Sequence, residues 1–250
     1  MAGHIGTLAH LLPALPTREM QVSAADRFTF QEASNRRWAF ATSKGPRLRT
    51  WQVDSTALTS EQAGALQELA EGAWGLGPFI FIPCPAHATN VLTPGQSLLE
   101  GVANGGPVAL PGGSTAPRSV VGGATVTLAD KVPVIPGKPV TVSLYMAGGS
   151  ATVSFKTLTG STVGSRPLVP TGDLMQRVTV TAPSVPATAR YATITATGYT
   201  ALARPQLSWT SEPVPWEVGG GVAQVVIQNS SPTPLRGGWS NISMQIVEVG

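Results

Sequence analysis

The sequence predicts a mainly β protein built from two modules, and its composition, strand-type alternation and single long helical stretch all point that way. It has 28 Gly and 22 Pro among 250 residues, while only 12% of residues are charged. Such frequent turn residues favour many short strands over long helices. We predict an antiparallel sheet with one helix from residues 1–90 plus 214–250, and a jelly-roll β-sandwich from residues 91–213.

The first module begins with residues that alternate in the strand period. Between Met20 and Asp54, aromatic or branched side chains recur at every second position within short runs. These alternating positions predict half-buried strands of an antiparallel sheet, and they are Phe28 and Phe30, Trp38 and Phe40, and Trp51 and Val53.

One stretch, "LTSEQAGALQELAEGAWGLG" at residues 58–77, changes to the helical period. Thr59 followed by Gln62 has the spacing of a capping box, so the helix should begin there. A C-terminal glycine commonly ends a helix, and Gly75 or Gly77 is expected to end this one. The apolar stripe that should face the sheet is Leu66, Leu69, Ala70, Ala73 and Trp74.

After residue 90 the composition shifts to Gly, Pro, Ser, Thr, Val and Ala. Short strands separated by turn clusters, with no helix between them, indicate a sandwich of the jelly-roll kind. The predicted strands are residues 124–129, 139–147, 151–158, 176–183 and 191–198.

The last 37 residues, 214–250, return to longer strands after the glycine triplet at 219–221. The triplet is expected to act as a sharp bend or hinge. Residues 222–228 and the alternating Ile242, Met244 and Ile246 should then complete the first module's sheet. This arrangement would make the jelly roll an insertion.

The segment "FIFIPCP" at residues 79–85 contains the only cysteine, Cys84, three residues before His87. A metal site needs further ligands, but no CxxC or HxxxH spacing occurs, and His4 and His10 fall in an N-terminal stretch without a clear pattern. We therefore expect no metal and no cofactor. Cys84 is predicted to be a small buried apolar residue at the end of a strand, and His87 a loop residue.

The charge pattern argues against nucleic-acid binding. The net charge is only +3, and the basic runs are "NRR" at 35–37 and "KGPRLR" at 44–49. Their basic side chains either are solvated or face the acidic helix side (Glu61, Glu68 and Glu71) of a neighbouring copy; they are Arg36, Arg37, Lys44, Arg47 and Arg49. We also expect no signal peptide and no membrane helix, hence a soluble chain made inside a cell.

Catalysis is not expected. A glycosidase needs two carboxylates about 5–10 Å apart in a cleft. The second module offers only Glu100, Asp130, Asp173 and Glu212, each in or beside a predicted turn. No Gly-x-Ser-x-Gly motif occurs, and the histidines are scattered along the chain. The sequence therefore predicts a protein that is not an enzyme.

The order of these segments resembles the minor tail proteins of long-tailed (siphovirus-type) phages of actinobacteria. A β-rich start with "RLRTWQVD" at 47–54 precedes one helix, and "NVLTPGQS" at 90–97 opens a new module. "PWEVGGGVAQVVIQ" at 215–228 and "SMQIVEVG" at 243–250 close the chain. The first module is similar to the ring-forming (belt) domain of distal tail proteins, whose β-sandwich with one helix is related to the tail-tube fold.

The middle module resembles galectin-like and carbohydrate-binding β-sandwiches. "NVLTPGQSLLEG" at 90–101 is similar to the opening of family 4/9-type carbohydrate-binding modules, with Val91 and Thr93 departing from it, and residues 189–209 look like their final strands. Sugar stacking needs exposed aromatic rings. Tyr199, in a predicted turn, and Trp209 are the candidate ligand-binding residues.

The resemblance implies a structural virion protein of the tail tip. Such a protein forms a ring, usually a homohexamer, that links the tail tube to the tail-tip and tail-fibre proteins of the adsorption apparatus. DNA only passes through its channel. The alternative is a carbohydrate-binding adsorption protein, without catalytic activity, that recognises host cell-wall glycan. A secreted sugar-binding protein fits less well, because the first module would then have no purpose.

Overall fold

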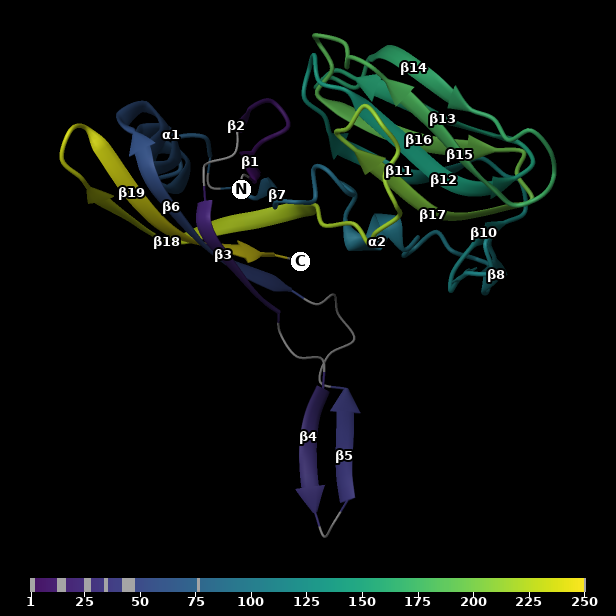
Figure 1. The fold of residues 1–250 in the computed structure, drawn as a ribbon, viewed down its shortest axis with the longest axis horizontal. Coiled ribbons are helices and arrows are strands. Elements are labelled where there is room, and N and C mark those ends of the chain that lie inside the picture. Colours follow the sequence, from purple (N-terminus) through teal and green to yellow (C-terminus); the bar gives the residue numbers. More distant parts are fainter. Residues whose placement is uncertain are drawn as a thin grey trace. The chain divides into compact units, whose positions relative to one another are not determined.

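The computed structural model describes residues 3–12, 17–24, 28–33, 36–41, 48–75 and 77–249, with side chains for 3–12, 21–23, 48–75 and 77–249 (Figure 1). The chain is mainly β and divides into two compact units. The sheet–helix unit contains Ala14–Phe79 and Gln224–Gly250, and the jelly-roll unit contains Gly3–Pro13 and Ile80–Ala223. Residues 80–90 and 214–223, which the sequence assigns to the first module, thus belong to the jelly-roll unit, as does the N-terminal segment.

The sheet–helix unit is an antiparallel sheet in which two strands from the end of the chain lie beside two strands that precede the jelly roll. Its order is β18 (Val222–Pro234), β19 (Trp239–Glu248), β6 (Arg49–Thr59) and β3 (Thr17–Ala24). Val53 of β6 lies opposite Met244 of β19, and Trp51 lies opposite Ile246. These four side chains are buried, so the expected alternation in both strands is confirmed. The closing strand β19 pairs directly with β6.

A hairpin of β4 (Phe28–Ala33) and β5 (Arg36–Ala41) lies in the same unit, with Phe28 opposite Ala41. The two predicted strands in this region are therefore confirmed. The aromatic side chains that predicted them lie outside the described side chains.

Helix α1 (Ser60–Ala70) contacts β6 and β19. The expected capping box is present, because the Gln62 N–H donates to Thr59 Oγ1 at 3.2 Å and the Thr59 N–H donates to Gln62 Oε1 at 3.1 Å. The expected end at Gly75 or Gly77 is wrong. Gly72, with φ of 79°, follows the cap residue Glu71 in the left-handed conformation that ends a helix.

The early end of α1 changes which side chains it buries. Ala63, Leu66 and Leu69 are buried as helical spacing requires. Ala73 and Trp74, which the sequence places on the buried stripe, lie beyond the helix and are exposed, Trp74 at 37%.

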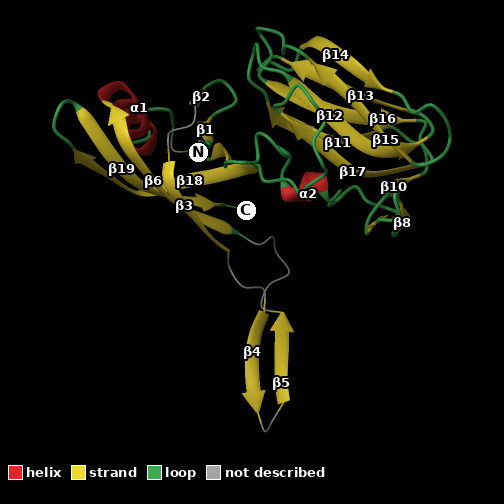
Figure 2. Cartoon of the chain, viewed as in Figure 1, coloured by secondary structure: helices red, strands yellow, loops and turns green. Residues whose placement is uncertain are grey.

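The jelly-roll unit contains two four-stranded antiparallel sheets (Figure 2). One has the order β10 (Val120–Val121), β17 (Ala201–Ser208), β12 (Val140–Ala147) and β15 (Gln176–Ala182). The other has the order β11 (Val126–Pro133), β16 (Tyr191–Thr197), β13 (Ser150–Lys156) and β14 (Thr162–Leu168).

Successive strands alternate between the two sheets, except for the β13–β14 hairpin. With eight strands, this order is that of a jelly roll, so the predicted topology is confirmed. The core between the sheets is one apolar cluster that includes Val142, Leu144, Met146, Val153, Phe155, Ile194 and Leu202.

Strand β14 is not among the strands that the sequence predicts. It lies at the edge of its sheet and is mostly exposed. An edge strand buries little, so it lacks the apolar alternation by which strands are recognised.

The shorter elements of the jelly-roll unit form two small ladders. One joins β8 (Val108–Ala109) to β9 (Thr115–Ala116), and the other places β1 (His4–Gly6) between β2 (Leu11–Leu12) and β7 (Phe79–Ile82). A short helix, α2 (Pro94–Ser97), begins with a capping box of Thr93 and Gln96. The sequence contains this Thr-x-x-Gln signature, but the helix was not predicted because it is only one turn long.

The segment that leads out of the jelly roll, residues 210–221, is bound to that unit by polar contacts. The Asn90 side chain donates to the Glu217 carbonyl at 2.8 Å, and the Gln206 side chain donates to the Pro215 carbonyl at 2.8 Å. The N–H groups of Gly220 and Gly221 donate to the carbonyls of Asn90 and Leu92, each at 3.0 Å. The glycine triplet is therefore fixed in place, and the expectation that it is a hinge is wrong.

Candidate functional site

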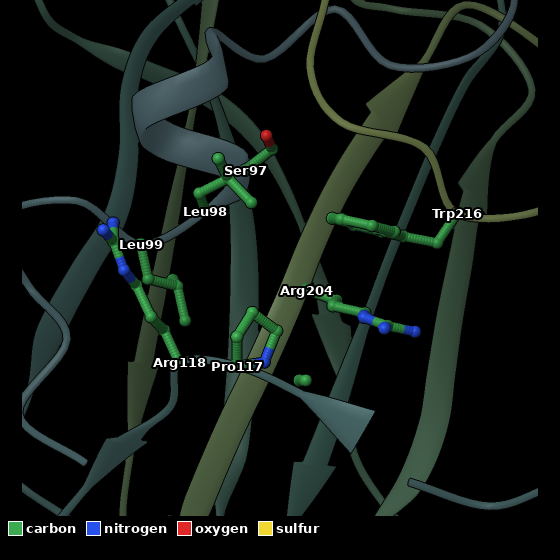
Figure 3. A pocket seen from close by; sticks show the side chains of 8 residues that line it. Ser97, Leu98, Leu99, Pro117, Arg118, Arg204 and Trp216 are labelled. Atoms are coloured by element: carbon green, nitrogen blue, oxygen red, sulfur yellow. The ribbon is translucent and has the colours of Figure 1, made fainter. Parts of the chain in front are cut away.

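A shallow depression lies on the jelly-roll unit where α2, the end of β9 and β17 meet Trp216 (Figure 3). The space within its outline is about 220 Å³, which includes open solvent, so the enclosed part is much smaller than a typical small-molecule site. Its lining residues are Ser97, Leu98, Leu99, Ala116, Pro117, Arg118, Arg204 and Trp216.

Two side chains of this depression form a stacked pair. The Arg204 guanidinium carbon lies 4.8 Å from the centre of the Trp216 ring, which is cation–π distance. Arg204 Nη2 donates to the Thr115 carbonyl at 2.9 Å, and the Trp216 indole N–H donates to the Pro205 carbonyl at 3.4 Å. The pair therefore fixes residues 210–221, here called the exit segment, against β17.

The other cation of the depression already has an acidic partner. Arg118 Nη1 lies 3.4 Å from Glu100 Oε1, and both side chains are about half exposed. The other lining residues are leucine, alanine, proline and Ser97, so the depression is a shallow and mostly apolar surface beside the indole ring. Its lining residues include no carboxylate.

A second group of polar residues lies where the N-terminal strand meets the turn after β7. The His4 and His87 ring centres are 6.0 Å apart, and Trp209 packs edge-on against His4 with ring centres 5.0 Å apart. The Nδ1 atoms of both histidines are buried without a hydrogen-bond partner. Burial and the neighbouring His87 lower the pKa of His4 to about 4, and burial also lowers the pKa of His87.

The sequence could not show this group, because pairing of β1 with β7 brings together histidines that are far apart in the chain. His4 lies opposite Ile82 in that ladder. The expectation that His4 lies in an irregular segment is therefore wrong, whereas His87 does lie in a turn, as expected. Among the described residues no group of three or more His, Cys, Asp or Glu side chains could hold a metal ion.

The two predicted ligand-binding residues have different environments. Tyr199 is 4% exposed and belongs to the core, so the surface position expected for it is wrong. Gly198, with φ of 69°, makes the turn and Tyr199 packs inward. Trp209 is half-buried, and its indole N–H donates to the Pro133 carbonyl at 3.3 Å. The structure does not bring Tyr199 and Trp209 into one binding surface, and their role in binding stays a prediction.

The carboxylates considered for catalysis have separate partners or surroundings. Glu100 pairs with Arg118, and Asp130 Oδ1 accepts a hydrogen bond from Thr193 at 2.7 Å.

Of the basic residues noted in the sequence, Arg49 forms an ion pair with Glu248 at 3.0 Å and lies 5.0 Å from the Trp51 ring centre. The side chains of Arg36, Arg37, Lys44 and Arg47 lie outside the described residues. No helix in the described part of the chain is long and apolar enough to cross a membrane.

Cys84 is half-buried, so the expectation of full burial is wrong. We expect Cys84→Ser to lower the free energy of unfolding by less than about 1 kcal/mol, because a partly solvated hydroxyl keeps its hydrogen bonds to water. Urea unfolding of both proteins measures this difference. A loss well above that value, or one zinc per chain in elemental analysis of the native protein, would contradict the structural role assigned to Cys84.

Comparison with solved structures gives distant likenesses. No protein-family model and no curated protein matches the chain. The enzymatically active domain of tailspike protein 4 of bacteriophage CBA120 is similar at 16% identity and a TM-score of 0.36, over 48% of this chain and 21% of that one. The VP2 subviral particle of infectious bursal disease virus is similar at 12% identity and a TM-score of 0.25, over 100% of this chain and 58% of that one. The chain thus spans less than two thirds of either protein.

Proposed function

We propose that the chain is a structural protein of a bacteriophage tail tip, a distal tail or minor tail protein, located in the virion. Copies of it assemble into a ring, a homohexamer, that links the tail tube to the tail-tip and tail-fibre proteins. The sheet–helix unit forms the ring and the jelly-roll unit is carried on it. The proposal assigns the chain no catalytic step.

One observation supports this proposal most. Strand β6, before the jelly roll, and strand β19, after it, pair along most of their length, so the sheet–helix unit is a single body interrupted by a second one. That is the order of elements on which the resemblance to ring-forming tail proteins rests. A single-purpose sugar-binding protein needs only the jelly roll, and the sheet–helix unit would be superfluous in it.

The sheet also has a strand from which a ring can be extended. β3 is the last strand in its sheet order, and Val22 in it is 55% exposed. Edge strands pair with further strands unless charges or prolines prevent it. We assign the contact between neighbouring copies to this edge.

Light scattering coupled to size exclusion tests the assembly. The chain has a mass of 25.8 kDa, so the particles formed by the purified protein should have six times that mass. Val22→Lys should lower the measured mass of these particles, because it places a charge on the proposed contact. Leu174→Lys, at an 84% exposed position of the jelly-roll unit, is the matched control and should leave the mass unchanged. A monomer at all concentrations would contradict the proposal.

The shallow depression beside Trp216 favours the second candidate, a non-catalytic adsorption protein that binds host cell-wall glycan. A partly exposed indole beside apolar residues offers a surface on which a sugar can pack, with the Arg204 guanidinium already stacked on the same ring. Calorimetric titration with N-acetylated glycan fragments should then show binding that Trp216→Ala abolishes. Absence of binding to the unaltered chain would leave the ring protein as the only function proposed.

A further inference from the structure

The ten N-terminal residues described, 3–12, are here called the N-terminal arm. The arm attaches to the jelly-roll unit through three residue pairs of the β1–β7 ladder, from His4 opposite Ile82 to Gly6 opposite Ile80. Its own hairpin is closed by hydrogen bonds between the backbones of Thr7 and His10, at 3.0 and 3.2 Å. A ladder this short has only marginal stability by itself. The side-chain contacts of the arm therefore matter for its attachment.

The arm packs on the jelly-roll unit through Leu11, which lies against its core cluster, and through the rings of the histidine pair, His4 and His87. His4 packs against both the His87 ring and the Trp209 ring, and Trp209 in turn is held by its backbone N–H, which donates to the His87 carbonyl at 2.8 Å. Both Nδ1 atoms lack a hydrogen-bond partner in their buried positions. A proton added to either ring would thus be buried next to a second imidazole.

No carboxylate lies in the segments around the pair to offset such a charge. Residues 3–12, 80–90 and 205–210 contain no Asp or Glu, and their other titratable groups are His10 and Cys84. Strand β11, which Trp209 reaches through its indole N–H, carries Asp130 and Lys131. The Asp130 carboxylate accepts a hydrogen bond from Thr193 of β16.

We propose that the histidine pair is a pH-dependent attachment for the N-terminal arm. When both rings are neutral, they pack against Trp209 and hold the arm on β7. When His4 takes up a proton, the arm leaves β7, the imidazolium reaches water, and the backbone of residues 80–82 loses its β1 partner. This inference does not depend on the proposed tail function.

The direction of the effect follows from the pKa of His4. It is about 4 with the arm attached and 6.5 in water, so the released arm binds protons more readily. The attachment is therefore complete above pH 6.5 and weakens as the pH falls from 6.5 toward 4. These two pKa values imply that the equilibrium constant for release rises about 30-fold between pH 8 and pH 5.

Amide hydrogen exchange of the full chain, corrected for the intrinsic pH dependence of exchange, measures this release. Protection of residues 4–6 and of their partners 80–82 should fall about 30-fold from pH 8 to pH 5. Protection of β12 and β16 in the jelly-roll core should stay unchanged over that range. Loss of protection in these core strands to the same degree would mean general acid unfolding and would overturn the proposal.

Three variants assign the effect to the pair. His4→Phe keeps an aromatic ring without a titrating group, so its arm should stay protected at pH 5. His10→Gln, in the exposed turn of the same arm, should keep the full fall. If His4→Phe does not hold its arm at pH 8, His87→Gln decides, since removing the second imidazole should shrink the fall. The same protection at both pH values in the unaltered chain, or an undiminished fall in His87→Gln, would overturn the proposal.

Discussion

Replacing Asn90 with alanine should lower the free energy of unfolding of the jelly-roll unit by about 3–5 kcal/mol. Asn90 is 0% exposed. Its amide donates to the Glu217 carbonyl at 2.8 Å, and its Oδ1 accepts from the N–H groups of Leu92 and Leu207, each at 3.2 Å. Alanine removes all three bonds and leaves buried backbone groups without partners, which costs more than the bonds themselves.

Asn104 provides a matched control for this prediction. Its amide donates to the Val121 carbonyl at 2.8 Å and its Oδ1 accepts from the Val121 N–H at 2.7 Å, but at an exposed position. Asn104→Ala should cost about 1 kcal/mol, because water replaces the lost partners. Urea unfolding followed by tryptophan fluorescence compares the two variants. Equal losses would show that the Asn90 contacts do not hold the exit segment.

Replacing Gly221 with alanine should cost about 3 kcal/mol or more. A Cβ at this position would overlap the carbonyl oxygen of Val91, and a Cβ at Gly219 would overlap that of Leu92. Both obstacles are backbone atoms, so relief requires the exit segment to move off the sandwich and give up the hydrogen bond from the Gly221 N–H to the Leu92 carbonyl. Thermal unfolding should show this loss.

Gly172→Ala is the control, since a Cβ there has no heavy atom within 4 Å. Its effect should stay below about 1 kcal/mol. If Gly221→Ala caused an equally small loss of stability, the glycine triplet would be the flexible hinge that the sequence predicts, and the exit segment would not be rigid.

The elements that the sequence predicts well are those with local signals. The alternation at Trp51 and Val53 and the capping box at Thr59 each report their own strand or helix. The five strands predicted in the middle module are also present, since each buries one face or both in the sandwich core. For these elements, burial imposes a period that can be read without knowing the partner.

The features that were missed depend on distant partners. The glycine triplet resembles a hinge until the carbonyls of Val91 and Leu92 are seen beside it. His4 meets His87 only because β1 pairs with β7. Tyr199 follows a turn glycine, as surface residues often do, yet it completes the core. Composition and spacing carry no information on such contacts.

Negative-stain imaging of the purified chain can show a ring built from sheet–helix units. We expect six-fold rings with a central hole, each subunit carrying one additional density for its jelly roll. Single separate particles at every protein concentration, with no closed rings, would contradict this assembly.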